Sequence, residues 1–235
     1  MKRIGIIGAM EVEVDFLRGL MGSGAKRTEA GSAVFEEGSI GGAPVVLVRS
    51  GIGKVNAALC AQRLILQFGC THIVNTGIAG AMAKELGALD FVVSTDAVQH
   101  DVDATGFGYR PGQIPQMDTF SFAADRRMAR AALEAFGEDE LSAGHKMIEG
   151  RIATGDQFIS DRETKARIQA AFAPACVEME GCAIAQACHL NGTPFVIIRC
   201  MSDNADDLKE NDYAFNEAAA GELSARIVRR MIPRI

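Results

Sequence analysis

Short apolar runs rich in β-branched residues recur along the chain and predict the strands of a buried sheet. Some of them, such as Val45–Ser50 and Pro194–Met201, are apolar at nearly every position rather than at alternate positions. Continuous runs of this kind are typical of strands covered on both faces by helices. The predicted strands are Arg3–Gly8, Val34–Ser39, Val45–Ser50, His72–Thr76, Phe91–Ala97, Gly144–Gly150, Ala175–Glu178 and Pro194–Met201.

Apolar positions three and four residues apart predict helices in several of the gaps between these strands. The predicted helices are Val12–Leu20, Lys54–Phe68, Ala123–Ala135, Arg162–Phe172, Gly181–Leu190 and Asp212–Met231. Because strands alternate with helices, we predict an α/β fold, a three-layer sandwich in which helices flank a central mixed, mostly parallel sheet. No linker divides the 235 residues, so one domain over residues 1–235 is expected.

Composition and charge argue against several classes of function. The chain is 48% hydrophobic and 23% charged, and its net charge of −6 includes no basic stripe that would bind nucleic acid. No apolar run approaches the ~20 residues of a membrane span, and no leader precedes the first strand, so we expect a cytoplasmic protein. Cysteines without C-x-x-C spacing and scattered histidines predict neither a metal nor another cofactor.

Polar and glycine-rich segments follow several predicted strands, where ligands bind in open α/β sheets. Glu11 and Glu13 follow the first strand, although acids there can simply complement a helix dipole. Gly51-Ile52-Gly53-Lys54 lacks the G-x-x-x-x-G-K-[ST] spacing of a phosphate loop, so its glycines indicate a tight turn that brings the backbone close to a ligand. Thr76–Gly80 is interpreted either as a ligand-binding turn or as a plain one.

The richest chemistry lies between Val177 and Asp206, at the ends of two further strands. Its ionisable and hydroxyl groups are Glu178, Glu180, Arg199, Ser202 and Asp203. A buried arginine can merely neutralise buried acids, but one ion pair does not account for five such groups. We therefore interpret the segment as a site that holds a polyhydroxylated sugar and moves a proton.

Seven short segments match sequence motifs of a known family: Ile6–Glu13, Ser50–Val55, Asn75–Gly80, Ala104–Gln113, Thr154–Ile159, Val177–Glu180 and Arg199–Asp206. In this order they resemble the bacterial 5′-methylthioadenosine/S-adenosylhomocysteine nucleosidases of the nucleoside phosphorylase superfamily, over essentially the whole chain. The resemblance implies hydrolysis of the N9–C1′ bond of adenine thionucleosides, in methionine salvage and removal of methyl-transfer products. It also implies that the protein is a homodimer. The implied ligand is a small-molecule substrate, and neither a nucleic acid nor a membrane is implied as a partner.

The resemblance further implies roles for individual residues. Asp203 matches the general acid at purine N7, Glu13 the base that activates water, and Glu180 the residue that grips the ribose hydroxyls. The remaining implied substrate contacts within the same subunit are Met10, Ile52, Ala79, Gly80, Phe158, Ile159, Met179, Arg199, Ser202 and Tyr213. Three further residues match positions that reach over the alkylthio pocket of the neighbouring subunit: Phe107, Tyr109 and Pro115.

These residue types suit glycosidic cleavage, which builds positive charge on the sugar and needs an acid at the leaving group. Asp203 must carry a proton to donate one, whereas Glu13 is expected in a wetter environment that keeps it ionised. Glu178 is expected only to pair with Arg199.

Two residues depart from the family pattern, and three alternative functions stay open. Ile78 replaces a common serine, which disfavours a phosphate nucleophile, and Tyr213 stands where phenylalanine is common. A purine nucleoside phosphorylase or an aminodeoxyfutalosine hydrolase on the same fold remains an alternative. A non-catalytic nucleoside-binding protein is a third, although it would not need both Glu13 and Asp203.

Overall fold

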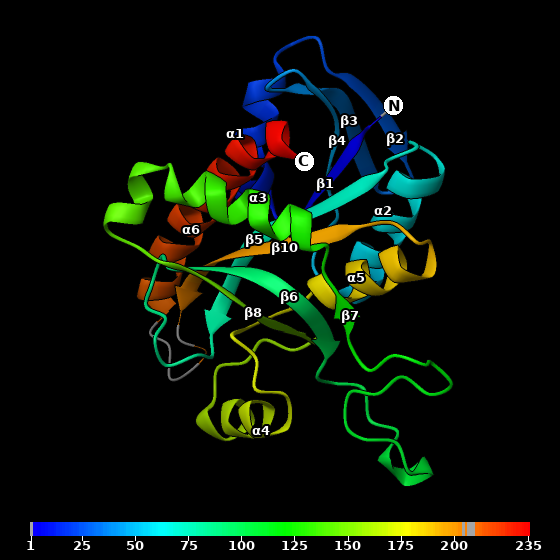
Figure 1. Ribbon diagram of the computed structural model, residues 1–235, viewed down its shortest axis with the longest axis vertical. Helices are drawn as coiled ribbons and strands as arrows, with labels where there is room; N and C mark the ends of the chain where they lie inside the picture. The colour runs from blue at the N-terminus through cyan, green and yellow to red at the C-terminus, as the bar shows by residue number, and fades with distance from the viewer. Residues whose placement is uncertain (1, 204, 206–209) are drawn as a thin grey trace.

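The computed structural model describes residues 2–203, 205 and 210–235, and the side chains of residues 210–215 lie outside this description. Within it, ten strands form one mixed sheet (Figure 1). The strands are β1 (Ile4–Gly8), β2 (Lys26–Ala30), β3 (Ala33–Ile40), β4 (Ala43–Arg49), β5 (His72–Ala81), β6 (Phe91–Gln99), β7 (Phe122–Ala123), β8 (Met147–Thr154), β9 (Cys176–Glu178) and β10 (Phe195–Asp203). The helices are α1 (Glu11–Met21), α2 (Lys54–Leu66), α3 (Arg126–Gly137), α4 (Arg162–Phe172), α5 (Gly181–Leu190) and α6 (Glu210–Met231), with the short 3₁₀ turns η1 (Thr105–Phe107), η2 (Glu140–Ala143) and η3 (Ile232–Arg234).

The strand order closes part of the sheet into a ring. The order is β10-β6-β8-β9-β5-β1-β4-β3-β2, and β10 pairs with β5 as well as with β6. Parallel pairs join β1 to β4 and β5, β10 to β5, and β8 to β6 and β9, whereas β2, β3 and β4 pair antiparallel. Because β5 and β10 are parallel neighbours, their carboxyl ends meet, and Asp203 pairs with Gly80.

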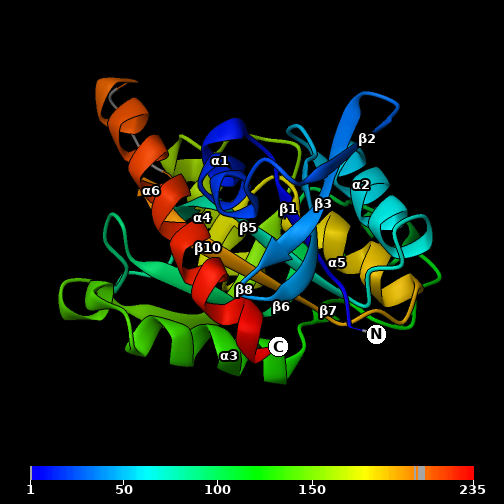
Figure 2. The same cartoon turned by 90° about the horizontal axis from the view of Figure 1, so that it is seen from above.

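Helices cover both faces of the sheet, which explains the continuous apolar runs (Figure 2). Ile7 of β1 packs in one core cluster with α2 and α5, whereas Ile4 and Ile6 pack in a second cluster with α1, α3 and α6. A third cluster places Ile168 and Phe172 of α4 against β6, β8 and β9. The predicted α/β fold class, with helices flanking a mixed sheet, is confirmed.

The carboxyl ends of β5 and β10 extend further than the sequence predicts. Helices Arg162–Phe172 and Gly181–Leu190 have the predicted bounds, but the strand predicted to end at Thr76 continues to Ala81. The prediction of a turn at Thr76–Gly80 is therefore wrong, because this segment pairs with β10 and β9. Glycines within a strand often mark a close approach of other groups to the backbone, as they do here.

Other errors occur at element starts and at one sheet edge. The helix predicted from Ala123 begins at Arg126, because Asp125 accepts hydrogen bonds from the first turn and Phe122–Ala123 pair with β6. The strand predicted from Gly144 begins at Met147. β2 is absent from the prediction because it is a polar strand that pairs only with β3, so it lacks an apolar pattern.

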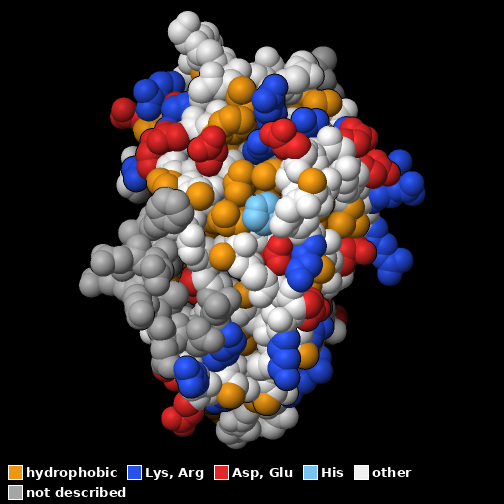
Figure 3. Space-filling view, turned by 90° about the vertical axis from the view of Figure 1, so that its left-hand side faces the viewer, with side chains coloured by type: hydrophobic (Ala, Val, Ile, Leu, Met, Phe, Trp, Pro, Cys, Tyr) orange, Lys and Arg blue, Asp and Glu red, His pale blue; other side chains and the backbone are white. Residues whose placement is uncertain are grey.

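The surface mixes both signs of charge. On the face shown in Figure 3, acidic and basic side chains are interspersed rather than gathered into a single stripe. None of the helices in the described part of the chain combines the length and apolarity needed to cross a bilayer.

Candidate active site

A cavity of about 90 Å³ opens where β1, β5, β9 and β10 end. Its wall includes three carboxylates whose residues lie far apart in the sequence: Glu13, Glu180 and Asp203. The other lining residues are Ala9, Met10, Ile52, Ile78, Ala79, Gly80, Phe158, Val177, Glu178, Met179 and Ser202. A smaller hollow beside Gln157 and Ile159 shares Gly80, Met179 and Asp203 with this cavity. The strand ends therefore bring the predicted acids to one place.

Three backbone N–H groups hold the carboxylate of Glu13 in place. Its Oε2 accepts hydrogen bonds from the N–H groups of Ala9 (2.6 Å) and Met10 (3.0 Å), and its Oε1 accepts from Ile78 N–H at 3.0 Å. The residue is only 1% exposed, so the expectation of a wetter environment is wrong. Burial raises the pKa of Glu13, while Arg199 and the three N–H donors oppose this rise.

Asp203 is buried and oriented by two hydrogen bonds. Ser202 Oγ donates to its Oδ2 at 2.8 Å, and Ala205 N–H donates to its Oδ1 at 2.7 Å. A Cβ at the paired residue Gly80 would lie 2.9 Å from Oδ1, so only glycine lets the carboxylate lie this close to β5. The Ser202 hydroxyl therefore orients the Asp203 carboxylate.

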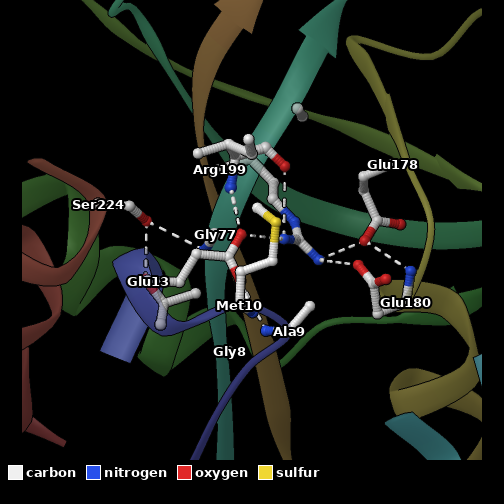
Figure 4. Close-up of polar contacts among 12 residues, drawn as sticks. Gly8, Ala9, Met10, Glu13, Gly77, Glu178, Glu180, Arg199 and Ser224 are labelled. Atoms are coloured by element: carbon white, nitrogen blue, oxygen red, sulfur yellow. Dashed lines mark hydrogen bonds and ion pairs between the residues drawn. The ribbon is translucent and has the colours of Figure 1, made fainter. Parts of the chain in front are cut away.

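Arg199 does not line the cavity. Figure 4 shows its guanidinium between Glu13 on one side and Glu178 and Glu180 on the other. Its Nη2 pairs with Glu178, donates to Asn75 Oδ1 at 2.7 Å and lies 3.8 Å from Oε2 of Glu180. Its Nη1 lies 3.9 Å from Oε1 of Glu13. Arg199 is only 1% exposed. Its positive charge therefore compensates three buried acids at once, and the side chain does not contact the cavity.

Glu178 has more contacts than the predicted ion pair with Arg199. It accepts a hydrogen bond from the Thr154 hydroxyl, and its Oε2 accepts the N–H groups of Glu180 (3.0 Å) and Gly181 (2.7 Å). These two donors are free N–H groups at the start of α5, so Glu178 caps that helix. The side chain therefore fixes the backbone that carries Glu180.

Glu180 is buried among charges of both signs. Burial and the negative charge of Glu178 raise the pKa of Glu180 to about 8. Its Oε1 accepts the N–H of Gly53 at 2.8 Å, which brings the turn before α2 to the cavity. The Gly51-Ile52-Gly53 turn thus contributes a backbone donor to the site, beside Ile52 in the wall.

The structure brings together most, but not all, of the implied substrate contacts. Met10, Ile52, Ala79, Gly80, Phe158, Met179, Glu180 and Ser202 line the cavity, and Ile159 lines its smaller neighbour. Tyr213 lies in α6, and its side chain is outside the described residues. Phe107, Tyr109 and Pro115 belong to the segment after β6 (Figure 1). They do not line the cavity. Phe107 is 87% exposed.

Sequence reasoning missed the supports of the site. Ala9, Val177, Asn75 and Gly53 contribute to it through apolar surface, a carboxamide or a backbone N–H. All four lie inside segments that carry the family resemblance, but the resemblance implied no role for them, since neither apolar surface nor a backbone donor is visible as chemistry. Among the described residues, no group of three His, Cys, Asp or Glu side chains has the geometry of a metal site.

Comparison with known proteins agrees with this geometry. Residues 3–233 match the model of the Phosphorylase superfamily, the class that this fold and site define. A 5′-methylthioadenosine/S-adenosylhomocysteine nucleosidase of Shewanella frigidimarina is 43% identical over 99% of this chain and 100% of the relative. The nucleosidase of the same name from Neisseria meningitidis, in complex with methylthio-immucillin-A, has a TM-score of 0.94 at 38% identity and covers 100% of both chains.

A native futalosine hydrolase of Helicobacter pylori is also similar, with a TM-score of 0.92 at 30% identity over 100% of this chain and 98% of that one. The two nucleosidases named above are more similar in sequence to this chain, at 43% and 38% identity. The chain therefore belongs to the 5′-methylthioadenosine/S-adenosylhomocysteine nucleosidase family of this superfamily.

Proposed function

We propose that this protein hydrolyses the N-glycosidic bond of 5′-methylthioadenosine and S-adenosylhomocysteine, and also of 5′-deoxyadenosine, releasing adenine and a 5-substituted ribose. The observation that carries the proposal is the convergence of Glu13, Glu180 and Asp203 on one cavity. The Neisseria meningitidis relative, which binds methylthio-immucillin-A, supports the choice of substrate.

In the proposed reaction, Asp203 donates a proton to purine N7 as the C1′–N9 bond breaks and its electron pair leaves with adenine. Water attacks C1′, forms the new C–O bond and gives its proton to Glu13. Ser202 orients the acid, and three N–H donors fix the base in one position. Glu180 binds the ribose hydroxyls, and the carboxylates stabilise positive charge on the sugar.

Water is favoured over phosphate as the nucleophile because the described cavity wall contains acids but no Lys or Arg. Arg199 is enclosed by three carboxylates, and Lys54 Nζ is bound to Asp101 (2.7 Å) and Gln99 (2.9 Å). A phosphate dianion beside several buried carboxylates would be repelled. Hydrolysis therefore fits this site better than phosphorolysis.

We further propose a homodimer, in which a second copy covers the face formed by α2 and α5. Val55, Leu59 and Leu190 expose apolar side chains around a hollow of about 420 Å³ there, and Leu66 of α2 is also exposed. Exposed apolar patches of this kind mark interaction surfaces. Phe107, Tyr109 and Pro115 are exposed or partly exposed in this chain, so they are available to reach the cavity of a neighbouring subunit.

The test is adenine release in phosphate-free buffer from methylthioadenosine, adenosylhomocysteine, 5′-deoxyadenosine and aminodeoxyfutalosine. Full-rate cleavage of the first two without phosphate is expected, and a strict requirement for phosphate would instead identify a phosphorylase. A preference for aminodeoxyfutalosine would favour the alternative suggested by the Helicobacter pylori structure. Sedimentation of the wild type and a Leu59→Asp variant tests the dimer, since the variant is expected to sediment as a monomer.

A further inference from the structure

A chain of polar contacts links three loops beside the cavity and ends at Glu180. Lys54 Nζ pairs with Asp101 Oδ1 at 2.7 Å, and Asp101 Oδ2 accepts the N–H of Asp156 at 2.9 Å. Asp156 Oδ1 in turn accepts the N–H of Lys54 at 2.8 Å, which closes a ring of three residues. The ring joins the turn before α2 to the segments that follow β6 and β8.

This ring stabilises the first turn of α2, which has no side-chain cap of its own. The N–H groups that open a helix need acceptors. Here the acceptors come from distant segments: Asp156 takes the N–H of Lys54, and Glu180 takes the N–H of Gly53. Gly53 has a φ of 99°, which favours glycine, so the turn depends on its external contacts to hold this conformation.

The ring is charge-assisted, and its Lys54–Asp101 pair is partly shielded from water, whereas Asp156 is exposed. The side chains of Lys54 and Asp101 are only 19% and 14% exposed. Partial burial favours neutral Asp101, but hydrogen bonds from Lys54 and from the N–H of Asp156 outweigh it and lower the pKa of Asp101. Hydrogen bonds in which the donor or the acceptor is ionised are stronger than neutral ones, so the ring stabilises the turn.

We propose that Asp156, fixed by Asp101 and Lys54, is a positioning residue for Glu180 and acts through the N–H of Gly53. The proposal rests on the proposed function, in which Glu180 binds the ribose hydroxyls. The Gly53 donor holds one oxygen of Glu180 in place and leaves the other for the sugar. Loss of Asp156 would release the turn and weaken ribose recognition without touching the acid or the base.

The experiment compares Asp156→Ala with the wild type on methylthioadenosine and on its 2′,3′-dideoxy analogue. For methylthioadenosine, we expect kcat/KM to fall about tenfold, mainly through KM, because a hydrogen bond to a charged group is lost. For the analogue without hydroxyls, we expect no fall. Asp156→Asn keeps an acceptor oxygen and should restore most of the activity on methylthioadenosine.

A double-mutant cycle tests whether the effect passes through Glu180. In a Glu180→Gln background, Asp156→Ala is expected to add at most a twofold loss, since the residue it positions has already been changed. The matched control is Asp125→Ala, which removes another helix cap, that of α3, remote from Glu180. It should lower the melting temperature while leaving the preference between the two substrates unchanged.

An equal fall on both substrates, no fall on either, or additivity with Glu180→Gln would overturn the positioning role. If Asp156→Ala does not fold, Lys54→Met provides the same comparison, since it removes the ammonium and keeps the stem. A wild-type enzyme that releases no adenine would refute the proposed function itself. An active wild type with an equal loss on both substrates would refute only the role of Asp156.

Discussion

Replacing Gly77 with alanine tests the contact between the proposed base and the buried arginine. A Cβ at this position would lie 2.1 Å from Nη1 of Arg199, 2.4 Å from Oε1 of Glu13 and 2.9 Å from its Cδ. Neither side chain is free to move, since Glu13 accepts three N–H groups and Arg199 is bound to Asn75 and Glu178. The φ of Gly77 is not positive, so the steric clash alone sets the effect.

The magnitude follows from overpacking and from the contacts that must break. Overpacking a tight core costs about 1–3 kcal/mol, and losing a hydrogen bond to a charged group costs about 1.5–3 kcal/mol. With one such bond to Glu13 lost, Gly77→Ala should destabilise the fold by about 3–5 kcal/mol, a fall in melting temperature of roughly 10 °C. Displacement of a general base should reduce kcat about 100-fold or more.

Thermal unfolding and phosphate-free adenine release measure the two effects of Gly77→Ala. Gly19→Ala is the matched control, because a Cβ there has no atom within 4 Å and Gly19 lies within α1. That control should be stabilised by about 0.5–1 kcal/mol with unchanged turnover. If Gly77→Ala keeps both kcat and melting temperature close to wild type, the described contact between Glu13 and Arg199 is wrong.

Three further substitutions test the acids and their counter-ion. Asp203→Asn should abolish turnover yet leave binding of a substrate analogue measurable by calorimetry; near-normal turnover would refute the acid assignment. Arg199→Met should destabilise the fold by about 3–5 kcal/mol in thermal unfolding, because buried carboxylates lose their partner; an unchanged melting temperature would contradict this. For Glu180, whose pKa is raised from 4.5 to about 8, the folded state keeps a proton that the unfolded chain releases between these values. The stability that this proton contributes is complete below pH 4.5 and is lost as the pH rises towards 8. The melting temperature of Glu180→Gln, measured relative to that of the wild type, should therefore increase as the pH rises from 4.5 to 8. A difference in melting temperature that stays constant with pH would disprove this.

The sequence predicted the fold because most strands here are buried on both faces. Their continuous apolar runs mark the strands wherever α helices cover the sheet, as for β1 and β4. It could not predict β2, an edge strand of polar residues, or the continuation of β5 through Gly77 and Gly80, because glycine within a strand resembles a turn. The errors in predicting strands thus occur where a strand is not buried or contains residues, such as glycine, with low β propensity.

For the candidate site, the sequence indicated which acids matter but not what holds them. Glu13, Glu180 and Asp203 stand out as ionisable groups at strand ends, and the structure places all three in one cavity. Their supports include backbone N–H groups of Ala9 and Gly53, which every residue except proline carries. Such donors become specific only through tertiary geometry, so the sequence did not show which carboxylate each N–H group would bind.

The balance of charge around Arg199 explains why this site suits water as the nucleophile. Glu13, Glu178 and Glu180 all lie within 4.0 Å of one guanidinium, so three ionised acids and one cation would leave a net charge of −2. Burial makes that charge costly, and the raised pKa of both Glu13 and Glu180 is the physical response. A cluster that holds protons this readily can accept one from water, whereas an incoming phosphate dianion would add negative charge to a cavity whose described wall contains no Lys or Arg.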